Sequence, residues 1–260
     1  MPATLILLFV LLPQLVDRTN QPEQLPVPPS RQLAPERRAD IYMARKMYRE
    51  AVESYNDAIE LTPRAARLYN KLGIAYHHQL MLDDARKSYE RATKIDKEFA
   101  QAINNLGTVY YAKRRYKKAA GTYRKALQLS PDSASIHSNL GTALFARGRI
   151  KQATEEYLIA LQLDPMVFDQ RNSVGTLLQE RSVADRARYY YFLSKAYAAA
   201  GIHDRALVFL RRALEEGFRR NPDNIAKEKE FEALSENPEF LSILYPGQAA
   251  ELRAAEAGAP

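Results

Sequence analysis

Apolar positions in the middle of the chain recur at helical spacing. Ala119, Tyr123 and Ala126 are separated by four and then three residues, so they lie on one face of a helix. A segment upstream carries Leu106 and Tyr110, which are four residues apart. This pattern predicts two amphipathic helices that pack against each other through their apolar faces.

The same pattern returns every 34 residues. Glycine occupies one register at Gly73, Gly107, Gly141 and Gly175. Three further registers keep the same step: Ala51, Ala85, Ala119 and Ala153; Tyr55, Tyr89, Tyr123 and Tyr157; Ala58, Ala92, Ala126 and Ala160. A fixed period of this length indicates a stacked repeat array. Glycine inside a helix costs about 1 kcal/mol relative to alanine, so its recurrence predicts close helix–helix contact.

The repeated units resemble a known family. Residues 105–110 (NLGTVY), followed by Ala119, Tyr123, Ala126 and Pro131, are similar to a near-consensus tetratricopeptide unit. The resemblance covers residues 36–165 strongly and 187–218 well. The chain departs from the family in having Tyr69, Ile103 and His137 where a large aromatic residue often opens the first helix. The resemblance implies an all-α, right-handed solenoid of antiparallel helix pairs with a C-terminal capping helix.

The chain divides into seven predicted segments. Pro35 truncates the first unit, and the stretch before the last unit is read as either an orphan helix or a loop insertion. A charged helix is expected around 223–235, within the cap. The segments are an apolar export signal or anchor (1–18), a Pro-rich linker (19–35), four units (36–167), the insertion (168–186), a fifth unit (187–220), a helical cap (221–246) and a flexible tail (247–260).

The N-terminal apolar run is short for a membrane span. The run from residue 3 to residue 16 is about 14 residues long, whereas a spanning helix needs about 20. The run is typical of an export signal, although no Lys or Arg precedes it and no clear cleavage site follows. We predict an exported, periplasmic or extracytoplasmic protein; a membrane-anchored or cytoplasmic protein is the alternative. Residues 189–197 and 213–218 resemble the ending of bacterial tetratricopeptide proteins, which favours a bacterial source.

Chemistry-bearing motifs are absent from the sequence. The chain has no cysteine, which excludes disulfides, thiol catalysis and cysteine metal sites. It has four histidines, and the adjacent pair His77 and His78 would point about 100° apart on a helix. No HExxH, Walker A or GxGxxG motif occurs. We therefore predict no catalytic residue, no metal site and no cofactor, and hence a protein that is not an enzyme.

Positive charge is concentrated in one segment. The net charge is +7, from 38 basic and 31 acidic side chains. The basic patch is predicted at the turn and outer face of the third unit, where it is either solvated surface or a contact for an acidic partner, nucleic acid or anionic membrane. It consists of Lys113, Arg114, Arg115, Lys117 and Lys118, and the run continues to Arg124 and Lys125.

The resemblance also implies a binding groove. In the family, the second, fifth, sixth, ninth and twelfth positions of each unit tend to face a concave surface. Here the second unit places Arg67, Asn70, Lys71 and His77 there. The third unit places Gln101, Asn104, Asn105, Thr108 and Tyr111, and the fourth places Ser135, Ser138, Asn139, Thr142 and Phe145.

The asparagines are expected to stack as a ladder, because Asn70 and Asn104, and likewise Asn105 and Asn139, are 34 residues apart. An amide has both donors and an acceptor, so it suits the backbone of an extended peptide. Similar arrays in the scaffold of O-linked sugar transferases use such ladders. A generic polar surface is the alternative. Arg67 and Lys71 would add a carboxylate contact.

Two aromatic residues, Tyr111 and Phe145, would either anchor a ligand in this groove or pack inward. We interpret the chain as a non-catalytic scaffold that binds a peptide segment of another protein. A nucleic-acid- or anionic-surface-associated protein using the basic patch, and a regulatory subunit of an enzyme encoded elsewhere, are the alternatives.

Overall fold

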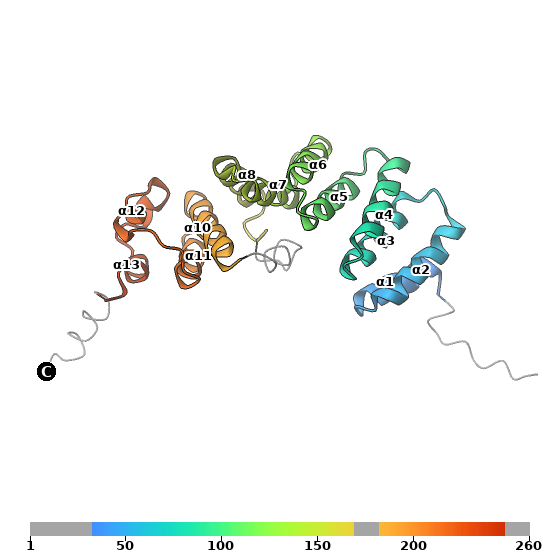
Figure 1. Ribbon diagram of the computed structural model, residues 1–260, viewed down its shortest axis with the longest axis horizontal. Helices are drawn as coiled ribbons and strands as arrows, with labels where there is room; N and C mark the ends of the chain where they lie inside the picture. Colours follow the sequence, from blue (N-terminus) through green and yellow to red (C-terminus); the bar gives the residue numbers. More distant parts are fainter. Residues whose placement is uncertain (1–32, 169–181, 248–260) are drawn as a thin grey trace, which may run out of the picture.

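The computed structural model describes residues 33–168 and 182–247. The predicted export signal, most of the Pro-rich linker, most of the 168–186 insertion with Gly175, and all of the C-terminal tail except Gly247 lie outside the described residues. The helices follow one another in chain order along the longest axis of the molecule (Figure 1).

The described chain is all-α and built of consecutive helix pairs. The pairs are α1 (Pro35–Ala44) with α2 (Tyr48–Leu61), α3 (Ala66–His78) with α4 (Leu82–Ile95), α5 (Ala100–Ala112) with α6 (Tyr116–Leu129), α7 (Ala134–Ala146) with α8 (Ile150–Leu163), and α10 (Val183–Ala199) with α11 (His203–Glu215). Short elements follow: α12 (Pro222–Ala226), the 3₁₀ helix η2 (Lys229–Leu234) and α13 (Pro238–Leu244).

The glycine register has the packing reason expected from the sequence. A β-carbon built on Gly107 of α5 would lie 2.6 Å from Cε1 of Tyr123 on α6. Tyr123 is fully buried, so its ring occupies the volume that a side chain at Gly107 would need. The two helices of a pair therefore approach each other because one offers no side chain where the other offers a ring.

The turn inside each pair has a register of its own, which the sequence analysis missed. Lys46, Leu80 and Arg114 have φ values of 60°, 60° and 57°, in the left-handed region. One period later the same place is taken by Gly148, with φ of 72°. Residues with a β-carbon are strained in this region, so the first three turns carry a conformational cost that the fourth avoids.

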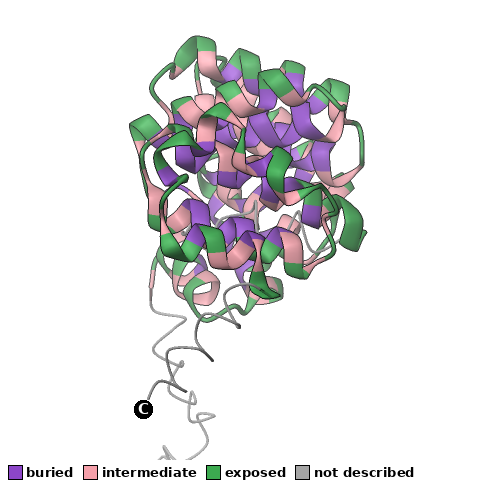
Figure 2. Cartoon of the chain, turned by 90° about the vertical axis from the view of Figure 1, so that its left-hand side faces the viewer, coloured by how far each residue is buried: buried purple, intermediate pink, exposed green. Residues whose placement is uncertain are grey.

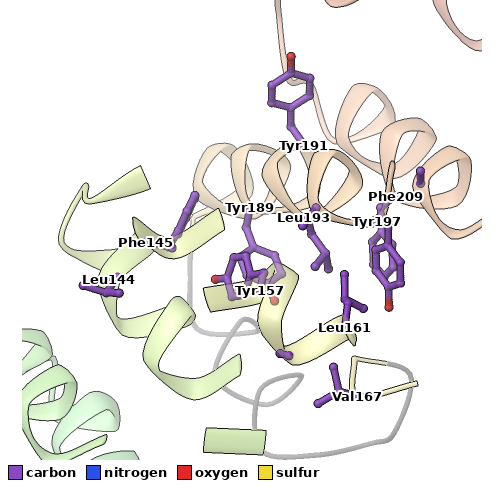
Figure 3. Packing of buried hydrophobic residues seen from close by; sticks show 14 of the residues in the cluster. Leu144, Phe145, Tyr157, Leu161, Val167, Tyr189, Tyr191, Leu193, Tyr197 and Phe209 are labelled. Atoms are coloured by element: carbon purple, nitrogen blue, oxygen red, sulfur yellow. The ribbon is translucent and has the colours of Figure 1, made fainter. Parts of the chain in front are cut away.

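The core runs through the array between helices rather than forming one central cluster. Figure 2 shows buried residues along the middle of the helices and exposed residues at their ends and turns. The fifth pair continues the array despite the long connection before it. Tyr189 of α10 packs edge-on against Tyr157 of α8 at 5.8 Å and against Phe145 of α7 at 5.6 Å between ring centres (Figure 3).

The C-terminal cap differs from the single charged helix predicted around 223–235. The chain forms α12 and η2 there, and Glu228 between them has an extended backbone with φ of −72° and ψ of 133°. Ion pairs to Lys195 at 2.8 Å and Arg220 at 2.5 Å hold the Glu228 carboxylate. The predicted single helix is therefore two short elements joined through Glu228, and Phe231 of η2 is fully buried.

Within residues 33–168 and 182–247, no helix is long and apolar enough to cross a membrane.

Candidate functional site

Asparagine side chains on the first helices of the pairs form hydrogen bonds from one pair to the next. Nδ2 of Asn105 on α5 donates to Oδ1 of Asn70 on α3 at 2.9 Å. Nδ2 of Asn139 on α7 donates to Oδ1 of Asn104 on α5 at 3.0 Å. These amides connect α3, α5 and α7 as a ladder, which we call the amide ladder.

The bonded residues are 35 apart, not 34 as predicted. Residues one period apart have equivalent orientations, so their side chains point the same way rather than toward each other. The next residue along a helix is turned by about 100°, which aims its amide back at the preceding pair. The predicted pairing of Asn70 with Asn104, and of Asn105 with Asn139, is therefore wrong, although all four amides take part.

The ladder leaves polar groups unpaired. Asn104 accepts through Oδ1, and within the described chain its amide nitrogen has no acceptor. Asn105 donates through Nδ2, and its oxygen has no donor there. Both residues are half-buried, whereas Asn70 and Asn139 are each 4% exposed. A free donor and a free acceptor thus remain accessible on consecutive residues of α5.

One ladder atom is buried without a partner. Oδ1 of Asn139 has no hydrogen bond within the described part of the chain. A buried acceptor left unsatisfied costs about 1–3 kcal/mol. The buried, unpaired oxygen of Asn139 therefore lowers the stability of the unbound protein.

Three predicted groove residues are instead buried and bonded internally. The hydroxyl of Tyr123 donates to Thr108 at 3.2 Å, and that of Tyr157 donates to Thr142 at 3.4 Å. Ser138 donates to the Ser135 carbonyl at 3.0 Å. The prediction that Thr108, Ser138 and Thr142 face an open groove is wrong, because all three are buried. The Thr108 and Thr142 hydroxyls bond to the second helix of their own pair, and Ser138 bonds to its own helix.

The cations Arg67 and Lys71 already have carboxylate partners in this chain. Nζ of Lys71 lies 2.7 Å from Asp40 and 3.1 Å from Glu36, both on α1. Arg67 forms an ion pair with Glu36. These internal ion pairs tie α3 to the truncated first unit. A contact of Arg67 and Lys71 with a carboxylate of a bound segment stays a prediction.

Tyr111 and Phe145 pack inward, which decides between the two alternatives left by the sequence. They are 4% and 5% exposed, and the Phe145 ring contacts Tyr189 and Phe192. Both residues nevertheless contribute to the lining of a hollow of about 500 Å³, together with Tyr116 of α6. We call it the aromatic hollow. Gln101, at the other end of α5, is exposed.

The basic patch is only partly free. Lys113 pairs with Asp83 at 2.5 Å, and Nζ of Lys118 lies 4.2 Å from the centre of the Tyr110 ring. Arg114, Arg115 and Lys117 are exposed. They line a second hollow, the basic hollow, of about 680 Å³; its remaining lining residues are Tyr116, Lys118 and Arg147.

Sequence reasoning missed Arg147 as part of this patch. Arg147 lies one period after Lys113, at the turn of the fourth unit. The repeat register therefore contained the signal, because successive turns of a stacked array lie on the same edge. A search restricted to a contiguous basic run could not find it.

Two of the four histidines, His77 and His137, have surroundings that the structure defines. Burial, and secondarily the nearby charge of His78, lowers the pKa of His77 to about 4. Nδ1 of His137 lies 2.7 Å from Glu156, and its Nε2 lies 2.8 Å from the carbonyl oxygen of Pro131. In the described ranges no group of three or more His, Asp or Glu side chains is placed to hold a metal ion.

Comparisons with known proteins agree with the repeat pattern. A family model described as TPR repeat matches residues 39–79 and 109–146, and one described as tetratricopeptide repeat matches residues 66–99. No curated protein matches the sequence.

Solved structures are similar in fold at low sequence identity. A MamA structure, an RS-1 ArsTM double mutant, is 16% identical over 72% of this chain and 93% of its own, with a TM-score of 0.51. A second MamA structure is 21% identical over 68% and 93%, with a TM-score of 0.49. YrrB, described as a TPR protein with an unusual peptide-binding site, is 21% identical over 72% and 88%, with a TM-score of 0.47.

Proposed function

This chain is a tetratricopeptide repeat protein, and from that premise we propose that it is a non-catalytic scaffold that binds an extended segment of another protein along its first helices. Such arrays are stacked from near-identical units and offer long continuous surfaces suited to binding extended segments. The amide ladder supplies the polar contacts in this proposal.

The observation that carries the proposal is the free donor of Asn104 beside the free acceptor of Asn105. An extended backbone presents one N–H and one C=O in each residue, and both need a partner when they leave water. The ladder already orients the two amides, because the other polar atom of each side chain is hydrogen-bonded to a neighbouring unit. Less side-chain freedom is therefore lost when a segment binds.

Affinity capture from native extract, read by mass spectrometry, tests this proposal. The wild type is compared with Asn104→Ala/Asn105→Ala and with Gln101→Trp, which adds bulk to the same helix without removing a ladder bond. The matched control is Gln128→Ala/Gln152→Ala, which removes two exposed amides from the second helices α6 and α8. Circular dichroism confirms that each variant remains helical.

A partner retained by wild type and control but lost by both groove variants supports the proposal. A partner that all four proteins retain equally overturns it, because the segment would then bind elsewhere. Export and a bacterial source stay predictions, and so does the alternative of a regulatory subunit, which stoichiometric copurification with a catalytic chain would support.

A further inference from the structure

The aromatic hollow and the basic hollow are two halves of one surface. Arg114 and Tyr116 line both of them. The aromatic half is lined by residues of α5, α6 and α7 and also by Asp185 and Arg188 of α10. The surface therefore spans three successive pairs of the array.

The basic half lacks compensating charge. Five cationic side chains line it, and no carboxylate does. In the part of the chain that the structure describes, Arg114, Arg115, Lys117 and Arg147 take part in no ion pair. Like charges held together in this way repel each other, and an anionic partner relieves that repulsion.

The aromatic half can receive a side chain. Its volume of about 500 Å³ lies within the range typical of small-ligand sites. Tyr111 and Tyr116 pack at 5.1 Å between ring centres with an angle of 57° between their planes, which gives the hollow a fixed aromatic wall. The one carboxylate among its lining residues, Asp185, accepts a hydrogen bond from Ser182 at 2.8 Å.

We propose that this joined surface docks an acidic peptide segment of another protein, with one large apolar side chain in the aromatic hollow and the flanking Asp or Glu carboxylates in the basic hollow. The inference rests on the proposed function, since both require that the protein binds a segment of a protein partner. It adds a second contact region, at the turns of the third and fourth units. It also specifies that the partner segment is negatively charged and carries one large apolar side chain.

Two other anionic partners fit the surface less well. Single-stranded nucleic acid binds by stacking bases on open aromatic faces, whereas Tyr111 and Phe145 are only 4% and 5% exposed. An anionic bilayer is a broad surface that meets protruding side chains, whereas the apolar part of this site is recessed. A short peptide enters a hollow of this size.

Fluorescence anisotropy with a labelled synthetic peptide, Glu-Asp-Glu-Phe-Asp-Glu-Glu, tests the proposal at about 0.15 M salt, where exposed charges are screened beyond roughly 8 Å. The full chain is compared with Arg115→Glu/Lys117→Glu. The matched control is Arg124→Glu/Lys125→Glu, which makes the same charge change at exposed positions of α6 outside the hollow. Acidic residues are favourable in the first turn of a helix, so the hollow variant is expected to fold.

The expected result is a loss of affinity of about tenfold or more for the hollow variant, and of less than about twofold for the control; tenfold corresponds to about 1.4 kcal/mol. A peptide with Ala in place of Phe should bind wild type about tenfold more weakly, because the apolar anchor is gone. Equal affinity of both peptides, equal loss in both variants, or no binding by wild type overturns the proposal.

Two further probes separate the partner classes. The probes are oligothymidine and vesicles of phosphatidylserine. If either binds more tightly than the peptide, and if that binding depends on Arg115 and Lys117, the proposal of a peptide partner is overturned in favour of that partner. Failure here is also distinct from failure of the proposed function. A captured partner that is lost by Asn104→Ala/Asn105→Ala but kept by Arg115→Glu/Lys117→Glu would leave the scaffold function standing and remove this docking site.

Discussion

The ring of Tyr123 lies against the α-carbon of Gly107. A β-carbon at Gly107 would lie 2.6 Å from the ring. A β-carbon at Gly141 would likewise lie 2.5 Å from the ring of Tyr157. Such distances are well below ordinary van der Waals contact. In the described chain Gly73, Gly107 and Gly141 each make room for one tyrosine ring, so the glycine and tyrosine registers share one period.

Replacing this glycine should destabilise the protein. Gly107→Ala gains about 1 kcal/mol of helix propensity, but overpacking a well-packed interface costs about 1–3 kcal/mol. Gly121→Ala on α6 is the control, since no atom lies within 4 Å of a β-carbon there. Thermal unfolding should show a lower Tm for Gly107→Ala and a higher Tm for Gly121→Ala. A rise in both would show that the ring can move aside.

The left-handed turn residue Leu80 offers a stabilising substitution. Its φ of 60° strains a residue with a β-carbon, and Leu80→Gly removes that strain, which we expect to raise stability by up to about 1 kcal/mol. Leu61 is equally exposed at 71% but ends α2. Leu61→Gly should therefore lower stability through lost helix propensity. Urea unfolding distinguishes the two, and equal effects would refute the strain argument.

His77 should make stability depend on pH. Its pKa is lowered to about 4 by burial, with a smaller contribution from His78, whereas in the unfolded chain it is about 6.5. The unfolded state therefore binds more protons between these values. This contribution is fully present above pH 6.5 and is lost as pH falls toward 4, by at most about 3 kcal/mol.

Unfolding free energies of wild type and His77→Gln, measured across this range, test the prediction. The difference between the two proteins should change between pH 6.5 and 4 and be constant above that range. His78→Gln, at the exposed neighbouring position, serves as the control and should retain most of the wild-type dependence. A pH-independent difference would mean that His77 titrates normally in the folded protein.

Lys71 should stabilise the truncated end of the array. It bridges Asp40 and Glu36 on α1, so Lys71→Gln leaves two neighbouring carboxylates without their shared cation. We expect a loss of about 1 kcal/mol that is reduced by high salt. Lys87→Gln, which removes an exposed pair with Asp84 inside one helix, should have no measurable effect in urea unfolding. Equal effects would show that the bridge does not hold α1 in place.

The sequence was sufficient to predict the helix pairs because their determinants are local. Spacing of three and four residues places Ala119, Tyr123 and Ala126 on one face, and the period of 34 shows that the same face is used again in each unit. The same period also predicts the glycine that lies opposite the tyrosine ring in a pair, such as Gly107 opposite Tyr123. Each of these features depends on contacts within one helix pair, and the spacing of residues along the sequence specifies those contacts.

The tertiary structure alone decided which polar groups remain free. The arrangement of successive pairs brings amides 35 residues apart into hydrogen bonds and directs Lys71 to α1. It also brings Arg147 beside Arg115 at neighbouring turns. Packing inside the third pair buries the Thr108 hydroxyl, which accepts a hydrogen bond from Tyr123. Hydrogen bonds and ion pairs depend on distances of a few tenths of an ångström between units, whereas a repeat period specifies only that units stack. The packing of units against one another therefore determined the candidate binding surface, whereas the repeat pattern of the sequence was enough to determine the fold.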